Sequence, residues 1–147
     1  PGRKRRVENR VSTERPLPGY RETRLIDPFE IFIGPIFESG AKGERRFALK
    51  IDERHVNRRG SLHGGMLMTF ADATLGAAAA DLADGGVAVT LNMQSHFLAP
   101  AHAGDVVEVA PTLTRRTRSM LFIRGDFMVG GDTIMTAASV WKVLGRT

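Results

Sequence analysis

One carboxylate, Asp72, stands within an otherwise apolar stretch of the chain. Residues 66–83 are rich in Ala, Met and Leu, a composition typical of a helix about five turns long. A carboxylate in the middle of such a helix is costly to bury unless it is paired, hydrogen-bonded or employed in chemistry. Asp72 could be bonded to backbone amides or to an arginine, or it could be a catalytic nucleophile or general base.

The turn before this helix, residues 57–65, could bind an anion. Its last two residues, Gly64 and Gly65, would let a ligand approach the backbone closely. The helix that follows presents unpaired N–H groups and the positive end of its dipole at its N-terminus. These donors could stabilise the oxyanion that forms when a carbonyl is attacked. The alternative is that both glycines only permit a tight strand-to-helix turn.

The spacing of these two features predicts a site shared by two chains. Gly64 and Asp72 are eight residues apart, which is roughly 12 Å along a helix axis. A reacting carbonyl must lie about 3 Å from both its oxyanion donors and its nucleophile or base. If two such helices pack antiparallel about a two-fold axis, the N-terminus of each can face the carboxylate of the other. We therefore expect a dimer if both groups act.

The elements that must position these groups can be read from the hydrophobic pattern. The helix should end at Asp84-Gly85-Gly86, where glycine stops it, and its apolar character on nearly every side predicts burial on most faces. Around it, alternation and turn signals predict strands. We expect a short strand or edge segment at 27–37, a half-buried strand at 45–52, and four strands of an antiparallel meander at 87–98, 105–114, 119–129 and 133–144.

One buried helix with five or six strands indicates an α+β protein. The arrangement is that of the hotdog fold, in which a curved antiparallel sheet wraps one long central helix. At 147 residues the chain has room for one such domain. We assign residues 25–147 to it and residues 1–24 to a basic, flexible N-terminal extension.

Charge and composition exclude several classes of function. The net charge is +5, but residues 1–24 hold eight Lys and Arg against three Glu, and residues 25–147 hold 13 against 13. A nucleic-acid partner is therefore not expected, because a nucleic-acid surface would lie on the folded body. No cysteine is present, so a thiolate metal site is impossible. The four histidines (His55, His63, His96, His102) lack the i, i+4 spacing of helix-borne metal ligands. We expect no metal, no membrane span and a cytoplasmic protein.

An ordered set of residues gives the chain a resemblance to a known family. Asn57, Gly60, the run His63-Gly64-Gly65, Asp72, Thr90 and the run from Phe97 to Ala101 resemble the hotdog acyl-CoA thioesterases of the phenylacetate-pathway and 4-hydroxybenzoyl-CoA type. The match covers about residues 45–144. It implies hydrolysis of an acyl- or aroyl-CoA by a homodimer, which would act either as the dimer or as a dimer of dimers (a homotetramer). No cofactor is implied, because coenzyme A is part of the substrate.

The resemblance also implies roles for individual residues. Asp72 would be the nucleophile or the general base for water, and the Gly64 N–H of the opposite subunit, helped by Asn57, would polarise the thioester carbonyl. Thr90 would carry a hydroxyl beside Asp72 that orients the water, although it could be an ordinary strand residue. His63 would shape the turn. Some relatives carry Glu at the helix position and Thr one turn later, where this chain has Asp72 and Gly76.

Two further regions could bind the substrate. Guanidinium groups and hydroxyls suit phosphate oxygens, so we expect the turn containing Arg115, Arg116, Arg118 and Ser119 to bind the CoA phosphates, unless it is only a solvated hairpin. Gly65 would contact substrate at the helix N-terminus. An aromatic or an aliphatic acyl group could be lined by Met66, Met68, Phe70 and Phe97.

Two alternatives remain open at this stage. A hotdog dehydratase acting on 3-hydroxyacyl or enoyl thioesters needs a His paired with Asp or Glu, and His55 and His63 precede Asp72 without lying in that family's motif. A non-catalytic acyl-CoA-binding module would use the same scaffold. The retention of Asp72 argues against it, because a binding module gains nothing from a buried carboxylate.

Overall fold

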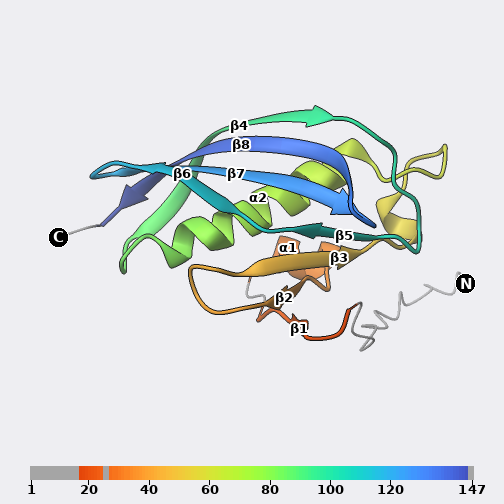
Figure 1. The fold of residues 1–147 in the computed structure, drawn as a ribbon, viewed down its shortest axis with the longest axis horizontal. Coiled ribbons are helices and arrows are strands. Elements are labelled where there is room, and N and C mark those ends of the chain that lie inside the picture. Colours follow the sequence, from red (N-terminus) through yellow and green to blue (C-terminus); the bar gives the residue numbers. More distant parts are fainter. Residues whose placement is uncertain (1–16, 25–26, 146–147) are drawn as a thin grey trace, which may run out of the picture.

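A computed structural model describes residues 17–24 and 27–145 of the chain. One long helix, α2, lies across one face of a curved antiparallel sheet that does not close into a barrel (Figure 1). The strands are β1 Arg21–Glu22, β2 Phe37–Ser39, β3 Arg46–Lys50, β4 Val87–Phe97, β5 Val106–Val109, β6 Thr112–Arg116, β7 Met120–Val129 and β8 Asp132–Leu144. The helices are α1 Pro28–Ile33 and α2 Gly64–Asp81, with a short 3₁₀ turn, η1, at Glu53–His55. The predicted α+β hotdog architecture is confirmed, although the sheet has eight strands rather than five or six.

The long helix forms where the Ala- and Leu-rich segment predicts it. His63 caps its N-terminus, because its ring Nδ1 accepts a hydrogen bond from the Gly65 N–H at 2.9 Å. One side of α2 packs into the core through Leu67, Phe70, Ala71, Thr74, Leu75 and Ala79. The opposite side contains the exposed Asp72 and Ala80. The expectation of burial on most faces is therefore wrong, since the sheet covers only one side of the helix.

The order of strands in the sheet is β1-β2-β3-β5-β7-β8-β4, with β6 paired to β7. The predicted simple meander is wrong at two places. The chain leaves β4 at one edge and crosses to β5, and β4 pairs instead with β8 over ten residue pairs from Val87↔Leu144 to Phe97↔Met135. The predicted strand 105–114 is divided into β5 and β6 at Pro111, whose missing N–H cannot continue a ladder.

The segment 27–37 is mostly helix rather than strand, contrary to our prediction. Asp27 is the N-cap of α1, its side chain accepts a hydrogen bond from the Phe29 N–H at 2.9 Å, and Pro28 occupies the first turn. Proline is favoured there because its fixed φ suits the helix and its missing N–H would be unpaired anyway. A strand, β2, begins only at Phe37.

Two neighbouring side chains of η1 hold the C-terminal end of α1. The guanidinium group of Arg54 donates to the carbonyl oxygens of Phe32, at 2.6 Å, and of Gly34. The His55 ring is 3 % exposed, with Nε2 at 2.8 Å from the Ile33 oxygen and Nδ1 accepting from the Asp52 N–H at 3.1 Å. These bonds fix the helix although Phe29, Ile31 and Phe32 are exposed.

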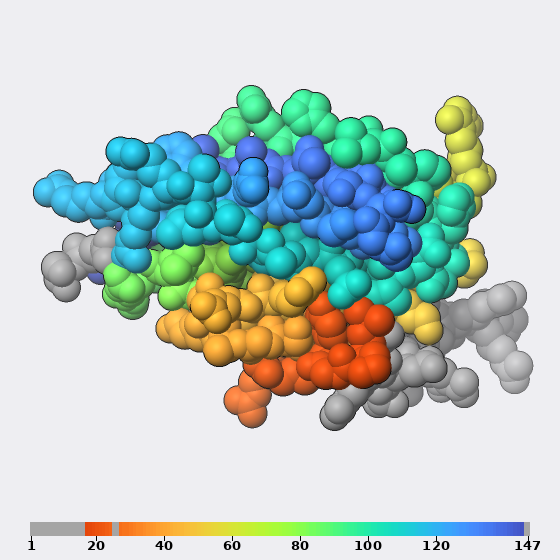
Figure 2. Space-filling model, viewed as in Figure 1, coloured from red at the N-terminus to blue at the C-terminus, as the bar shows by residue number. Residues whose placement is uncertain are grey.

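The N-terminal segment that the structure describes lies against the sheet. Tyr20 is buried beside Phe37 and Ala48, and its hydroxyl donates to Glu108 Oε1 at 2.9 Å. β1 pairs with β2 through Arg21↔Glu38 and Glu22↔Phe37. The space-filling view shows this red and orange part joined to the body of the molecule (Figure 2). Residues 17–24 of the predicted extension are thus ordered on the sheet, and residues 1–16 lie outside the described residues.

The buried His55 predicts loss of stability in mild acid. Burial lowers the pKa of His55 from its ordinary value of 6.5, against the opposing charge of Asp52. Because the unfolded chain binds a proton more readily than the native chain, the free energy of unfolding should fall as the pH falls below about 6.5. Denaturant unfolding at pH 7.5 and 5.5 measures this. His55→Gln should remove most of the dependence and the exposed-site control His102→Gln should retain it; the same dependence in both variants would refute the assignment.

Candidate active site

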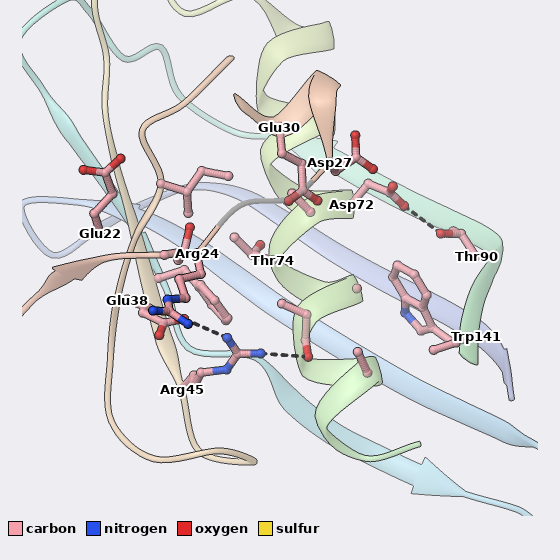
Figure 3. A pocket seen from close by; sticks show the side chains of 18 of the residues that line it. Glu22, Arg24, Asp27, Glu30, Glu38, Arg45, Asp72, Thr74, Thr90 and Trp141 are labelled. Atoms are coloured by element: carbon pink, nitrogen blue, oxygen red, sulfur yellow. Dashed lines mark hydrogen bonds and ion pairs between the residues drawn. The ribbon is translucent and has the colours of Figure 1, made fainter. Parts of the chain in front are cut away.

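The central contact of the candidate site joins α2 to β4. Thr90 Oγ1 donates a hydrogen bond to Asp72 Oδ1 at 2.8 Å (Figure 3). Both residues are exposed in the single chain, so Asp72 is not the buried carboxylate that its apolar neighbours in the sequence suggested. The hydrogen bond fixes one carboxylate oxygen and leaves the other available to a ligand.

Asp72 and Thr90 stand at a cavity of about 940 Å³. It is bounded by α2, by β4 and Trp141, and on the N-terminal side by residues 21–24, Asp27 and Glu30. A second cavity of about 300 Å³ lies between α1 and the N-terminal half of α2. Asp72 lines both cavities. The Asp72 carboxylate can therefore contact a ligand that extends into either cavity.

A tryptophan explains why α2 has glycine one turn after Asp72. A Cβ atom at Gly76 would lie 3.0 Å from the Trp141 ring. Trp141 is buried, and its Nε1 donates to Ser139 Oγ at 2.8 Å, which in turn donates to the Ile123 oxygen at 2.7 Å. The ring thus occupies the place that a helix hydroxyl would need, which leaves Thr90 as the hydroxyl beside Asp72.

The predicted oxyanion donors lie at the N-terminus of α2, about two turns before Asp72. The Gly65 N–H is engaged by the His63 ring, whereas within the described residues no partner for the Gly64 N–H is found. Asn57 Nδ2 donates to Ser61 Oγ at 3.0 Å and its Oδ1 accepts from the Arg59 N–H at 2.8 Å. His63 therefore shapes the turn, and Asn57 braces the loop that precedes it.

Gly64 and Asp72 belong to the same continuous helix. Eight residues of regular helix separate them by about 12 Å along the axis, so the structure of one chain does not bring them together. The site shared between two subunits stays a prediction, for which the single chain provides the two halves.

The predicted phosphate-binding residues gather at the β6–β7 turn. Arg115, Arg116 and Arg118 are exposed there, although Arg116 also forms an ion pair with Asp84. Ser119 Oγ accepts a hydrogen bond from Lys142 Nζ at 3.0 Å. Lys142, on β8, is a basic group of this cluster that the sequence did not reveal, because its proximity depends on strand pairing.

The predicted acyl-lining residues separate into two groups. Phe70 is fully buried and packs edge-to-face on Phe127, with ring centroids 5.8 Å apart. It is a core residue, and its assignment to the ligand pocket was wrong. Met68 lines the smaller cavity, Met66 is partly buried beside the core, and the exposed Phe97 places its ring 3.4 Å from a Cβ built on Gly64.

Two carboxylates near Asp72 were missed because the segment that carries them was expected to be a strand. Asp27 and Glu30 line both cavities together with Asp72. Burial, followed by the charges of Asp27 and Asp72, raises the pKa of Glu30 above its ordinary value of 4.5. The pair Asp27-Pro28 is a helix-start signal and could have placed these groups on a helix.

Two histidines of the described chain lie near a carboxylate, His55 beside Asp52 at 3.5 Å and His102 beside Asp105 at 3.9 Å, but neither pair lines the cavities at Asp72. His55 is committed to the Ile33 oxygen and the Asp52 N–H, and His63 caps α2. Among residues 17–24 and 27–145 no group of three His, Cys, Asp or Glu side chains could hold a metal ion. No helix in that same part of the chain is long and apolar enough to cross a membrane.

Comparison with known proteins identifies the family. The sequence model of the thioesterase superfamily matches residues 59–136, more than half of the chain. The chain belongs to the thioesterase superfamily. This assignment confirms both the expected hotdog fold and the expected class of thioester hydrolase.

Individual relatives of this thioesterase are similar over most of its length. It is 32 % identical over 128 residues to a Pseudomonas aeruginosa protein whose name places it among the esterases, covering 86 % of this chain and 92 % of that one. It is 27 % identical to human acyl-coenzyme A thioesterase 13, covering 67 % and 71 % of the two chains. A mutant of the phenylacetic acid degradation protein PaaI of Thermus thermophilus superposes with a TM-score of 0.73 and 25 % identity, covering 80 % and 100 %.

The contact between Gly76 and Trp141 predicts that introducing a hydroxyl-bearing residue at position 76 would destabilise the protein. Gly76→Thr should lower the free energy of unfolding by about 1–3 kcal/mol, because added atoms must displace a buried ring. Trp141 is the one tryptophan of the chain, so its fluorescence should change as well. Ala80→Thr, on an exposed position of the same helix, controls for the lower helix propensity of threonine; equal effects of both substitutions would contradict the steric explanation.

Proposed function

We propose that this thioesterase hydrolyses acyl-CoA thioesters with Asp72 as its nucleophile or general base. The observation that carries the proposal is the hydrogen bond from Thr90 to Asp72 at the wall of a cavity. The similarity to human acyl-coenzyme A thioesterase 13 supports acyl-CoA as the substrate class. No cofactor is required, since water and the substrate supply every atom of the products.

In the general-base route, Asp72 takes a proton from water as the water oxygen bonds to the thioester carbon. The carbonyl oxygen becomes an oxyanion, which then re-forms the carbonyl and expels the CoA sulfur. The proton that Asp72 took from water passes to the departing sulfur, and the products are a carboxylic acid and CoA thiol. In the nucleophilic route an Asp72 oxygen bonds to the same carbon first and expels the CoA sulfur, and water later hydrolyses the resulting anhydride, which frees the acid and Asp72.

Thr90 serves either route by holding the carboxylate. Its hydroxyl donates its one hydrogen to Asp72 Oδ1, so the lone pairs on the Thr90 oxygen can accept a hydrogen bond from the attacking water. Asp72 Oδ2 is then the oxygen that takes the proton from water in one route or bonds to the reacting carbon in the other. The hydrogen bond also fixes the rotamer of a side chain that is otherwise exposed.

The oxyanion donors come from a second subunit in this proposal. β4 is the last strand of the sheet and pairs on one edge only, with β8, among the described residues. Leu91, Phe97 and Leu98 are exposed on or beside it, and an unpaired apolar edge of this length is a surface for another strand. Antiparallel pairing of β4 with its counterpart would set two α2 helices side by side, with the Gly64 N–H and Asn57 of each facing the Asp72 of the other. A dimer or a dimer of dimers is the assembly that the family resemblance implies.

The cluster of Arg115, Arg116, Arg118 and Lys142 is proposed to bind the CoA phosphates. Guanidinium forks match phosphate oxygens, and their exposure leaves them accessible. Ser119 is joined to Lys142 and would position that ammonium group. Gly65 offers a close approach to the backbone at the start of α2 for the thioester end of the substrate.

The alternative of a dehydratase is not favoured by the geometry. That reaction needs a histidine within reach of the substrate, and His55 is buried with both ring nitrogens engaged. A binding module without catalysis would not need the oriented carboxylate of Asp72.

Asp72→Asn should abolish most of the activity while substrate binding is kept. The amide keeps the shape but cannot accept a proton from water or attack the thioester, so kcat should fall by about a hundredfold or more. Release of free thiol from a panel of acyl-CoAs measures the rate. Asp126→Asn, an exposed carboxylate on β7, is the matched control and should retain full activity; an Asp72→Asn rate equal to that of the control would rule out both routes.

Mixing two inactive variants tests the shared site. Gly64→Pro removes the N–H at the first helical position, where proline is tolerated, and the extended backbone of His63 at φ −64° and ψ 130° suits a following proline. Subunit exchange with Asp72→Asn should create heterodimers with one intact site, so up to about half of the heterodimer's sites regain activity.

Two controls make the mixing experiment decisive. Gly64→Ala keeps the N–H and should stay active, because its Cβ would meet only the Phe97 ring at 3.4 Å. Exchange must be verified by mass spectrometry of differently labelled subunits. No recovery of activity after verified exchange would show that each chain contains a complete site.

A further inference from the structure

We propose that two carboxylates at the start of α1, the N-cap residue Asp27 and Glu30 within the helix, select the acyl group of the substrate. They are named the α1 wall here. The α1 wall excludes acyl chains that end in a carboxylate and favours uncharged chains and chains that end in a hydroxyl group. The inference rests on the proposed function, because it names the substrate class of the same site.

The position of the α1 wall places it beside any acyl group that reacts. Asp27, Glu30, Asp72 and Ala73 are the residues that line both cavities. Figure 3 shows the labelled Asp27 and Glu30 next to Asp72. A thioester carbon must come within about 3 Å of its nucleophile or of the attacking water. Whichever cavity receives the acyl chain, the chain therefore starts at Asp72 and passes the α1 wall.

Acidic side chains outnumber basic side chains in the lining of both cavities at Asp72. The smaller cavity is lined by three carboxylates, and none of its lining residues among those described is Lys or Arg. The larger cavity includes cations, but Arg45 is tied to Glu38 and Asp81 at 2.7 and 2.8 Å, and Arg21 pairs with Glu38 at 2.9 Å. Arg24 lines the larger cavity and not the smaller one.

The effect of this field on a carboxylate is visible in Glu30 itself. Its pKa is raised by burial and then by the charges of Asp27 and Asp72. A carboxylate on the acyl chain would enter the same partly desolvated space and meet the same like charges, which disfavour binding. A hydroxyl group would instead donate a charge-assisted hydrogen bond to Glu30 or Asp27.

The α1 wall is held in place, so the repulsion cannot be relieved by moving it aside. Asp27 accepts from the Phe29 N–H and caps the helix. Arg54 and His55 bind the carbonyl oxygens at the other end of α1. The C-terminal end of this short helix is thereby fixed to the body of the protein, and Asp27 is fixed to the helix by its own cap.

Three substrates that differ only at the end of a five-carbon acyl chain test the inference. Pentanoyl-CoA, 5-hydroxypentanoyl-CoA and glutaryl-CoA end in a methyl, a hydroxyl and a carboxylate group. At fixed low ionic strength, where charges are least screened, kcat/KM for glutaryl-CoA should be at least about tenfold below that for pentanoyl-CoA. The value for 5-hydroxypentanoyl-CoA should equal or exceed that for pentanoyl-CoA. The four- and six-carbon pairs, butyryl with succinyl and hexanoyl with adipyl, extend the comparison to other lengths.

Substitution of the α1 wall should reduce the discrimination. Glu30→Gln should lower the ratio of kcat/KM for pentanoyl-CoA to kcat/KM for glutaryl-CoA by at least about threefold. Asp27→Asn should lower this ratio as well, and the asparagine preserves the helix cap. Glu44→Gln makes the same change in net charge on an exposed loop residue and should leave the ratio unchanged. Thermal unfolding of each variant verifies that it is folded. If Glu30→Gln does not fold, Asp27→Asn provides the test.

Several outcomes would overturn the inference. They are equal kcat/KM values for dicarboxylic and neutral acyl-CoAs at every length, or an unchanged ratio in both α1-wall variants. If the wild type hydrolyses none of the thioesters, the proposed function fails, and the inference is decided by binding alone. Thioether analogues with a methylene between sulfur and carbonyl should then show the same tenfold ratio in Kd, whereas equal Kd values or no binding would overturn it.

Discussion

Packing of α2 against one face of the sheet is the contact on which the rest of the structure depends. Leu67, Phe70, Thr74 and Leu75 enter the core on that side, so the side chains on the far side of the helix are left outside it. A helix of this apolar composition would ordinarily be covered all round. Here the uncovered side carries Asp72, which is exposed and accepts a hydrogen bond from the Thr90 hydroxyl. The same incomplete cover creates the cavities in which a substrate can lie.

Much of this arrangement could be predicted from the sequence because its signals are local. The long helix follows from an uninterrupted Ala- and Leu-rich segment with glycines after it, and β7 and β8 follow from alternation between clear turns. Asp72 and Thr90 were recognised as a pair through the family resemblance, and the structure places them 2.8 Å apart. The exposure of Asp72 could not be predicted, since the sequence does not reveal which side of an apolar helix the sheet leaves bare.

The parts that were missed depend on distant contacts. The pairing of β4 with β8 joins residues more than 35 positions apart, and turn signals between neighbouring strands favour a meander instead. Lys142 joins the basic cluster through the register of the β7–β8 hairpin, in which it pairs with Met120. The sequence predicts a strand where α1 lies, because the six residues of this helix are too few to show helical periodicity and four of them are large and apolar. With α1 misassigned, Asp27 and Glu30 could not be placed beside Asp72.

The way α1 is attached has a consequence for how this enzyme could diversify. The helix is held largely through main-chain oxygens, which Arg54 and His55 bind, and three of its side chains point into solvent. Main-chain attachment tolerates changes of side chain, so positions on this one turn and a half can drift without disturbing the core or the carboxylate on α2. A few substitutions in this segment could therefore change which substrate the enzyme accepts while the reaction itself is preserved.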